Sequence, residues 1–212
     1  IIKSIYIDLI GDKFPHESDI IKAQTVISYV KNMMMTTAEA RAEYLPEVSI
    51  YEELYKKYVD TLKMQRRMDY DDQLIYAKRI LEKYPQLLAE FQERYQYICV
   101  DEAQDTSKIQ HEIIRMLAAK WNNIFMVGDE DQSIYRFRAA YPRALLDFTD
   151  TYVNPYIMFL ETNYRSTQPI VSAAQKFISK NINRHSEKFM QASRGDGKPI
   201  ERIKKKKKHE QY

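Results

Sequence analysis

Residues 98–105 read Ile-Cys-Val-Asp-Glu-Ala-Gln-Asp, a short apolar run that ends in two adjacent carboxylates. Such a run between polar residues is typical of a buried strand. Open α/β sheets place ligands beyond the carboxyl ends of their strands. We therefore expect a strand that ends at Val100 and a site that begins with Asp101 and Glu102. A solvated acidic turn after a strand is the simpler alternative, and this run alone leaves it open.

The segments that follow this run alternate between short apolar stretches and helical patterns. Strands are expected at 97–100, 124–127 and 156–160. Helices are expected after each strand: one that carries Ile109, Ile113, Met116 and Leu117, one around 144–148, and one over 166–178. Strands that alternate with helices indicate parallel βαβ units. The fold class predicted for this part is therefore α/β.

The residues before Tyr95 have a helical pattern instead. Apolar side chains recur there at three- and four-residue steps, which places them on one face of a helix. Thr36 with Glu39, and Ser49 with Glu52, have the spacing of capping boxes. Asp69 is expected to cap a further helix. The apolar stripes consist of Ile20, Ala23, Ile27, Val30 and Met34, and of Leu54, Tyr58 and Leu62.

The composition limits the classes of protein to consider. The 212 residues are 44% hydrophobic and 30% charged, and no apolar run reaches the roughly 20 residues that span a membrane. No signal peptide is visible, so a cytoplasmic location is expected. The net charge is +3, but the lysines at 204–208 contribute five positive charges and the rest carries −2. The weakly basic balance is therefore no argument for a basic nucleic-acid surface.

The single cysteine and His111 are the side chains to consider as metal ligands. One cysteine excludes an internal disulfide framework and a cysteine-based zinc site. Cys99 and His111 both lack partners at ligand spacing. We therefore predict no metal role for either residue.

Residues 127–138 form a second polar segment at the end of an expected strand. Gln132 offers an amide that could sense a phosphate. Tyr135 and Phe137 could stack on unpaired bases, with Arg138 against the phosphate backbone. The alternative is ordinary packing, because aromatic side chains near a sheet edge usually belong to the core.

A third segment, residues 160–167, lies where a strand gives way to a helix. Arg165 could reach a γ-phosphate there, and Tyr164 could stack on an adenine ring. The alternative is a surface arginine beside a capping serine.

In this order the three segments resemble the UvrD/Rep-type superfamily 1 DNA helicases. Asp-Glu-Ala-Gln-Asp at 101–105 is similar to motif II of that family, the segment at 127–138 to motif III, and Glu-Thr-Asn-Tyr-Arg-Ser at 161–166 to motif IV. Residues 69–74 resemble a family segment that precedes motif II. The resemblance covers residues 68–181.

The resemblance implies cofactors and a role for each matching position. The cofactors are ATP and Mg²⁺, and the partners are single-stranded and duplex DNA. Asp101 and Glu102 would form the magnesium site, in which Asp101 holds the metal, and Glu102 would be the general base. The implied nucleotide contacts are Asp101, Gln104, Tyr164 and Arg165. The implied catalytic residues are Glu102, Gln132 and Arg165, and Arg165 would act as an arginine finger. The implied DNA contacts are Tyr135, Phe137 and Arg138.

The resemblance also implies a domain organisation. The fold would be the parallel-sheet portion of a RecA-like P-loop NTPase helicase core with a largely helical N-terminal insertion. Residues 1–67 would form that insertion, 68–155 the later part of the first RecA-like domain, and 156–212 the start of the second with a basic tail.

The sequence departs from the family pattern in two places. Phe137-Arg138-Ala139-Ala140 stands where the family usually has an aromatic residue followed by Arg-Gly-Ala, so a slightly different turn is expected. The Gly-rich phosphate loop, Gly-x-x-x-x-Gly-Lys-Ser/Thr, is missing from the 212 residues: Gly197-Lys198 is preceded by Ala192 at the first glycine position and followed by Pro199. We expect this chain alone to be inactive in ATP hydrolysis.

The function expected of the parent protein is ATP-dependent, 3′-to-5′ DNA unwinding and translocation. Two alternatives remain open: a motor subunit of a helicase–nuclease repair complex, and a non-catalytic DNA-binding remnant. DNA repair, replication restart and plasmid replication all use this chemistry. The sequence therefore leaves the pathway, the protein partners and the oligomeric state open.

Overall fold

A computed structural model describes residues 1–11, 14–39, 49–133 and 139–201, with the side chains of 49–51 left out. The chain divides into two compact units, Ile1–Val153 and Asn154–Tyr212. Both units mix helices with small parallel sheets, which agrees with the predicted α/β class.

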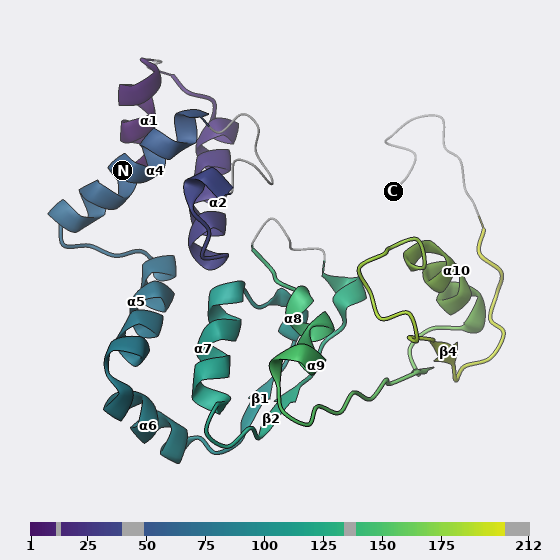
Figure 1. The fold of residues 1–212 in the computed structure, drawn as a ribbon. Helices are drawn as coiled ribbons and strands as arrows, with labels where there is room; N and C mark the ends of the chain where they lie inside the picture. Colours follow the sequence, from purple (N-terminus) through teal and green to yellow (C-terminus); the bar gives the residue numbers. More distant parts are fainter. Residues whose placement is uncertain (12–13, 40–48, 134–138, 202–212) are drawn as a thin grey trace. The chain divides into compact units, whose positions relative to one another are not determined.

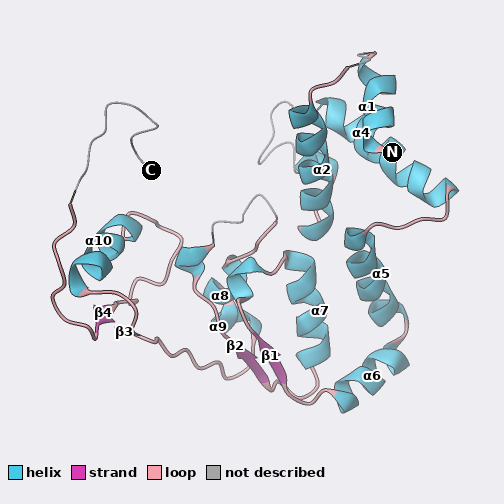
Figure 2. Ribbon diagram, turned by 180° about the vertical axis from the view of Figure 1, so that it is seen from behind, coloured by secondary structure: helices cyan, strands magenta, loops and turns pink. Residues whose placement is uncertain are grey.

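Three helices form the N-terminal part of the first unit, and Figures 1 and 2 show them from opposite sides: α1 (Ile2–Ile10), α2 (Glu17–Asn32) and α4 (Ser49–Met64). They pack pairwise because each carries one apolar face. The predicted stripes are confirmed except at Met34, which lies beyond the end of α2. The buried side chains of this core are Ile5, Ala23, Ile27, Leu54, Tyr58 and Leu62.

Two further helices follow, and each begins with a favourable N-terminal residue. Helix α5 (Tyr70–Lys83) starts with a capping box, in which the Asp69 side chain accepts from the Asp72 amide and the Asp72 side chain accepts from the Asp69 amide. Helix α6 (Pro85–Arg94) has its proline in the first turn, where no amide hydrogen bond is lost. The predicted cap at Asp69 is confirmed.

The first unit also contains a small parallel sheet. Strand β1 (Ile98–Val100) pairs with β2 (Ile124–Met126), with Val100 opposite Met126. Helix α7 (Lys108–Ala118) connects them, so the unit is a βαβ crossover, as expected. Figure 1 shows α7 between α5 and the short helices α8 (Arg143–Leu146) and α9 (Phe148–Thr151).

A short antiparallel bridge ties the segment before α8 to the start of α7. Ser107 pairs with Ala140, and the Tyr141 amide donates to the Thr106 carbonyl. Ala139 is fully buried and has φ of 62°, in the left-handed region. The alanine therefore holds a backbone conformation that favours glycine, the residue usual here in the family that the sequence resembles.

The second unit contains two short strands and one long helix. Strand β3 (Thr162–Asn163) pairs in parallel with β4 (Gln191–Ala192), and α10 (Gln168–Ile178) connects them. The helix predicted at 166–178 is confirmed, and Pro169 lies in its first turn.

The strand predicted at 156–160 is wrong. In the described part of the chain these residues have no strand partner, and Tyr156, Met158 and Leu160 are largely exposed. The apolar run matches a strand locally, but a strand also needs a neighbour for its backbone hydrogen bonds. Pairing begins only at Glu161, whose carbonyl accepts from the Gln191 amide.

Over the described residues, no helix combines the length and apolar character needed to cross a membrane.

Candidate functional site

The two carboxylates that follow β1 are both exposed to solvent. Glu102 has φ of 48°, a left-handed conformation that costs about 1–2 kcal/mol in a residue with a Cβ. Neighbouring bonds hold it there: the Glu102 amide donates to Asp101 Oδ1 at 2.9 Å, and the Asp105 amide to the Glu102 carbonyl at 2.9 Å. Strain of this kind in an exposed acid suggests a functional constraint.

Gln104 is buried directly behind this acidic pair, with 2% of its surface exposed. It lies in the 3₁₀ turn η1 (Ala103–Asp105). Its Nε2 donates to Glu102 Oε2 at 2.6 Å, and its Oε1 accepts from the Asp129 amide at 3.0 Å. The nucleotide contact predicted for Gln104 stays a prediction; in the structure both ends of its amide are bonded to protein groups.

The turn that follows β2 is organised by the Asp129 side chain. Its Oδ1 accepts from the Asp131 amide at 3.1 Å, and its Oδ2 accepts from Gln132 Nε2 at 2.7 Å. These bonds shape the 3₁₀ turn η2 (Glu130–Gln132) and leave the Gln132 side chain exposed. The structure thus joins Glu102 to Gln132, through Gln104 and Asp129.

Gly128 allows the two turns to approach each other. A Cβ at this position would lie 2.7 Å from Gln104 Oε1, 2.8 Å from a Leu145 methyl carbon and 3.2 Å from the Ala103 amide nitrogen. The Ala103 amide donates to the Val127 carbonyl at 3.0 Å. A side chain at 128 would therefore push apart the segments that the hydrogen bonds join.

His111, on α7, supports η1 from the other side. Its Nε2 lies 3.2 Å from the Ala103 carbonyl and also contacts Thr106 Oγ1, which itself donates to that carbonyl. Because the carbonyl only accepts, Nε2 must carry the proton and Nδ1 must be the acceptor. Burial lowers the pKa of His111, which favours this neutral form.

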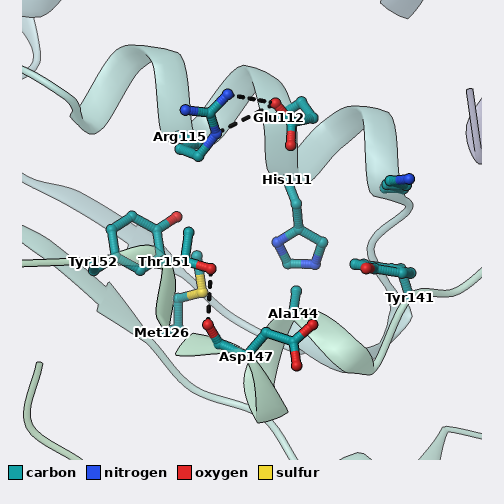
Figure 3. A pocket seen from close by; sticks show the side chains of 10 residues that line it. His111, Glu112, Arg115, Met126, Tyr141, Ala144, Asp147, Thr151 and Tyr152 are labelled. Atoms are coloured by element: carbon teal, nitrogen blue, oxygen red, sulfur yellow. Dashed lines mark hydrogen bonds and ion pairs between the residues drawn. The ribbon is translucent and has the colours of Figure 1, made fainter. Parts of the chain in front are cut away.

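The His111 ring points into a small cavity between α7 and the α8–α9 segment (Figure 3). Within the described part of the structure, His111 Nδ1 has no hydrogen-bond partner. Arg115 and Glu112 form an ion pair at 2.7 Å on the rim. Burial raises the pKa of Tyr152, which also lines the cavity, to about 12.

The exposed pair after β1 has donors suited to magnesium. Mg²⁺ in nucleotide sites is usually bound by one or two carboxylates together with phosphate oxygens. Asp101 and Glu102 supply such oxygens, and Asp101 is held in place by its bond to the Glu102 amide. Among the described residues no group of three His, Cys, Asp or Glu side chains converges on one point. A substrate phosphate would complete the ligand set.

The third predicted segment lies in the second unit. Asn163 Oδ1 accepts from the amides of Arg165 at 2.9 Å and Ser166 at 2.8 Å. This turn leaves the side chains of Tyr164, 73% exposed, and Arg165 facing solvent just before α10. Both predicted nucleotide contacts are thus accessible. The predicted DNA contacts Tyr135, Phe137 and Arg138 lie outside the described residues.

A second polar cluster, which the sequence did not indicate, joins α2 to α5. The Lys31 side chain is 1% exposed, and its Nζ lies 2.6 Å from Asp69 Oδ2 and 2.7 Å from Asp72 Oδ1. Tyr58 Oη also donates to Asp69 Oδ2, and Asn32 Nδ2 to Asp71 Oδ1. We call this set the Lys31 cluster.

Hydrogen bonds outweigh burial in the Lys31 cluster. Burial alone would lower the pKa of Lys31, but its bonds to Asp69 and Asp72 raise it above the usual 10.5. Burial would likewise raise the pKa of Asp69, but the bonds from Lys31, the Asp72 amide and Tyr58 lower it below 3.8. Both shifts favour the charged forms in the folded chain.

Comparison with known proteins identifies the class. Residues 2–153 match the UvrD/REP helicase N-terminal domain, and residues 158–212 match the UvrD-like helicase C-terminal domain. The first match alone covers more than half of the chain. The chain therefore belongs to the UvrD/REP helicase family.

Individual relatives agree with this assignment. The chain is 36% identical over 194 residues to the putative ATP-dependent DNA helicase YjcD of Bacillus subtilis, and the aligned residues cover 92% of this chain and 25% of that protein. It is 38% identical over 159 residues to the ATP-dependent DNA helicase PcrA of Staphylococcus aureus, where the aligned residues cover 74% of this chain and 22% of that protein. A probable DNA helicase II homolog of Rickettsia felis is 40% identical over 159 residues, with 75% and 24% covered. The chain thus spans about a quarter of the length of these relatives.

Proposed function

We propose that the protein to which this chain belongs is an ATP-dependent DNA helicase that hydrolyses ATP with Mg²⁺ and moves 3′ to 5′ along single-stranded DNA. One observation carries the proposal: an exposed carboxylate pair at the end of β1 is hydrogen-bonded, through Gln104, to the turn that presents Gln132. The names of the relatives, which are ATP-dependent DNA helicases, support the same reaction. The direction of movement rests on the family resemblance.

The residues of the site have distinct roles in this proposal. Asp101 holds the metal ion, which when bound neutralises charge on the phosphates. Glu102 orients the attacking water and accepts its proton, for which its exposed position at the sheet edge is suited. Gln132 contacts the γ-phosphate, and Tyr164 and Arg165 contact the nucleotide. The exposed, strained Glu102 favours a hydrolase over a non-catalytic DNA-binding remnant, because a remnant has no need to keep that conformation.

The proposed architecture follows the same family. Residues 68–155 contribute to a RecA-like domain, 1–67 to a helical insertion, and 156–212 to a second RecA-like domain. The parallel crossover of β1, α7 and β2 supports the first assignment, and the helical core of α1, α2 and α4 supports the second. We propose that Tyr135, Phe137 and Arg138 contact single-stranded DNA. The cytoplasmic location is carried over from the sequence as part of the proposal, and the proposal leaves open whether the protein acts in DNA repair or in replication restart.

The test compares two proteins. The whole protein should hydrolyse ATP faster with single-stranded DNA, should need Mg²⁺, and should unwind duplexes with a 3′ single-stranded tail but not a 5′ tail. The 212-residue chain alone should show no turnover above background, because it contains no Gly-x-x-x-x-Gly-Lys-Ser/Thr loop. If single-stranded DNA does not stimulate ATP hydrolysis by the whole protein, the proposal is refuted. Turnover by the isolated chain would show that another group binds the phosphates.

A further inference from the structure

Gln104 is placed to connect the two halves of the candidate site. It is buried, and its side chain bonds to the backbone of the turn after β2. One amide atom bonds to a side-chain oxygen of Glu102, and the other to the main chain at Asp129. The contact therefore links a candidate catalytic group to the backbone of a different segment.

The two partners fix the orientation of the Gln104 amide. The Asp129 amide can only donate, so the atom facing it must be the oxygen. The Glu102 carboxylate, when ionised, can only accept, so the atom facing it must be the NH₂ group. A residue in this place must donate at one side and accept at the other. Aspartate and glutamate lack the donor, and an apolar side chain of the same length has neither group.

Burial strengthens these two hydrogen bonds of the Gln104 side chain. Gln104 is 2% exposed, so water cannot easily replace either partner. Gly128 supports the arrangement, because a Cβ there would lie 2.7 Å from Gln104 Oε1. On the far side, the Asp129 carboxylate binds the Gln132 side chain at 2.7 Å. A displacement of Gln104 would therefore affect Glu102 and the Gln132 turn together.

We infer that Gln104 is a positioning residue that holds the Glu102 carboxylate at a fixed position relative to the Asp129–Gln132 turn. In this role it would act through Glu102, rather than contact the nucleotide directly as the sequence led us to expect. The inference rests on the proposed function. Gln104 acts on hydrolysis through Glu102, so its loss should lower the turnover number and leave ATP binding nearly unchanged.

The first test is steady-state ATP hydrolysis by the whole protein with single-stranded DNA. Gln104→Met removes both bonds, and Gln104→Glu keeps only the acceptor facing the Asp129 amide. Both should lower kcat about tenfold, the low end of what loss of a group orienting an active-site ligand costs, while KM for ATP stays within about twofold. The matched control is Gln92→Met, which removes a side-chain bond to the Met116 carbonyl away from the site and should leave kcat unchanged.

Gly128→Ala tests the same contact without changing Gln104 itself. The new Cβ should displace the Gln104 side chain, so this variant should also have a lower kcat. Each rate is divided by the concentration of folded protein, and thermal unfolding of each variant gives the folded fraction. A raised KM with unchanged kcat would overturn the inference in favour of direct nucleotide contact. A lowered unfolding temperature with unchanged kcat would overturn it in favour of a purely structural role.

A readout independent of catalysis uses the ¹⁵N-labelled 212-residue chain. Glu102→Gln should shift the NMR signals of both the Gln104 side-chain amide and the Asp129 backbone amide. Unchanged Asp129 signals would contradict the link. Absence of hydrolysis by the wild-type whole protein would refute the proposed function, whereas normal kcat in Gln104 variants of an active protein would overturn this inference alone.

Discussion

Asp69 and Asp72, at the start of α5, share one buried lysine, whereas Asp101 and Glu102, at the end of β1, are exposed to solvent. In sequence both pairs are simply neighbouring acids. In the first pair the carboxylates bond to Lys31, to each other's amides and, for Asp69, to Tyr58. In the second, Glu102 sits in a left-handed conformation with its side chain accessible. The buried, ion-paired acids are suited to holding α2 and α5 together, whereas the exposed acids after β1 remain accessible to a ligand, which agrees with the catalytic role proposed for them.

The largest effect on stability should come from Lys31→Met. Removal of the cation leaves two carboxylates near a largely buried position without their partner, which should cost about 3 kcal/mol of unfolding free energy. Urea denaturation of the 212-residue chain measures it. Lys57→Met is the control: Lys57 is 47% exposed and pairs with Glu53 at 3.3 Å, so its loss should cost under about 0.5 kcal/mol. Equal losses in the two variants would contradict a special contribution of the Lys31 cluster to stability.

A smaller effect should appear when the pH is changed. The pKa of Asp69 is lowered in the folded chain, so its contribution is full above 3.8 and is lost as the pH falls through 3.8 toward the folded value. The stability difference between wild type and Asp69→Asn should therefore shrink below pH 3.8. The pKa of Lys31 is raised, so its contribution is full below 10.5 and is lost as the pH rises past the folded value. A difference that stays constant from neutral to acid pH would contradict this account.

The smallest effect should come from Ala139→Gly. Ala139 has φ of 62°, where a Cβ is strained and glycine is not. Relief of this strain, less the greater freedom of glycine in the unfolded chain, should raise the unfolding free energy by about 0.5–1 kcal/mol. Thermal and urea unfolding of the same chain would detect the gain. Ala23→Gly, in the interior of α2 and as fully buried as Ala139, is the control and should be destabilising. A loss of stability in Ala139→Gly would mean that its buried methyl group matters more than the strain.

Local patterns in the sequence were sufficient for the elements that surround the site. The apolar runs at β1 and β2, the stripes of α2 and α4, and the cap at Asp69 were all predicted, because each depends on residues a few positions apart. The strand at 156–160 was not found, because pairing depends on a neighbour that local pattern cannot supply.

The contacts that position the site depend on residues far apart in the chain. Gln104 and Asp129 are 25 residues apart, and Lys31 and Asp69 are 38 apart. Nothing in the spacing of α2 marks Lys31 as buried. The group of acids at 69–72 was the only available signal, since buried carboxylates need a partner. The exposed residues Asp101, Glu102 and Gln132 could be named from the sequence, but the contacts that hold them could not: Gln104 was named only as a nucleotide contact.

The most direct test of the central claim is ATP turnover by the whole protein carrying Glu102→Gln, at saturating ATP, Mg²⁺ and single-stranded DNA. Glu90→Gln, the same change on an exposed glutamate of α6, is the matched control. The account predicts that turnover falls about 100-fold or more in Glu102→Gln, the loss expected for a general base, and is unchanged in Glu90→Gln. Turnover in Glu102→Gln within a few-fold of wild type would show that the acidic pair after β1 is an ordinary surface turn.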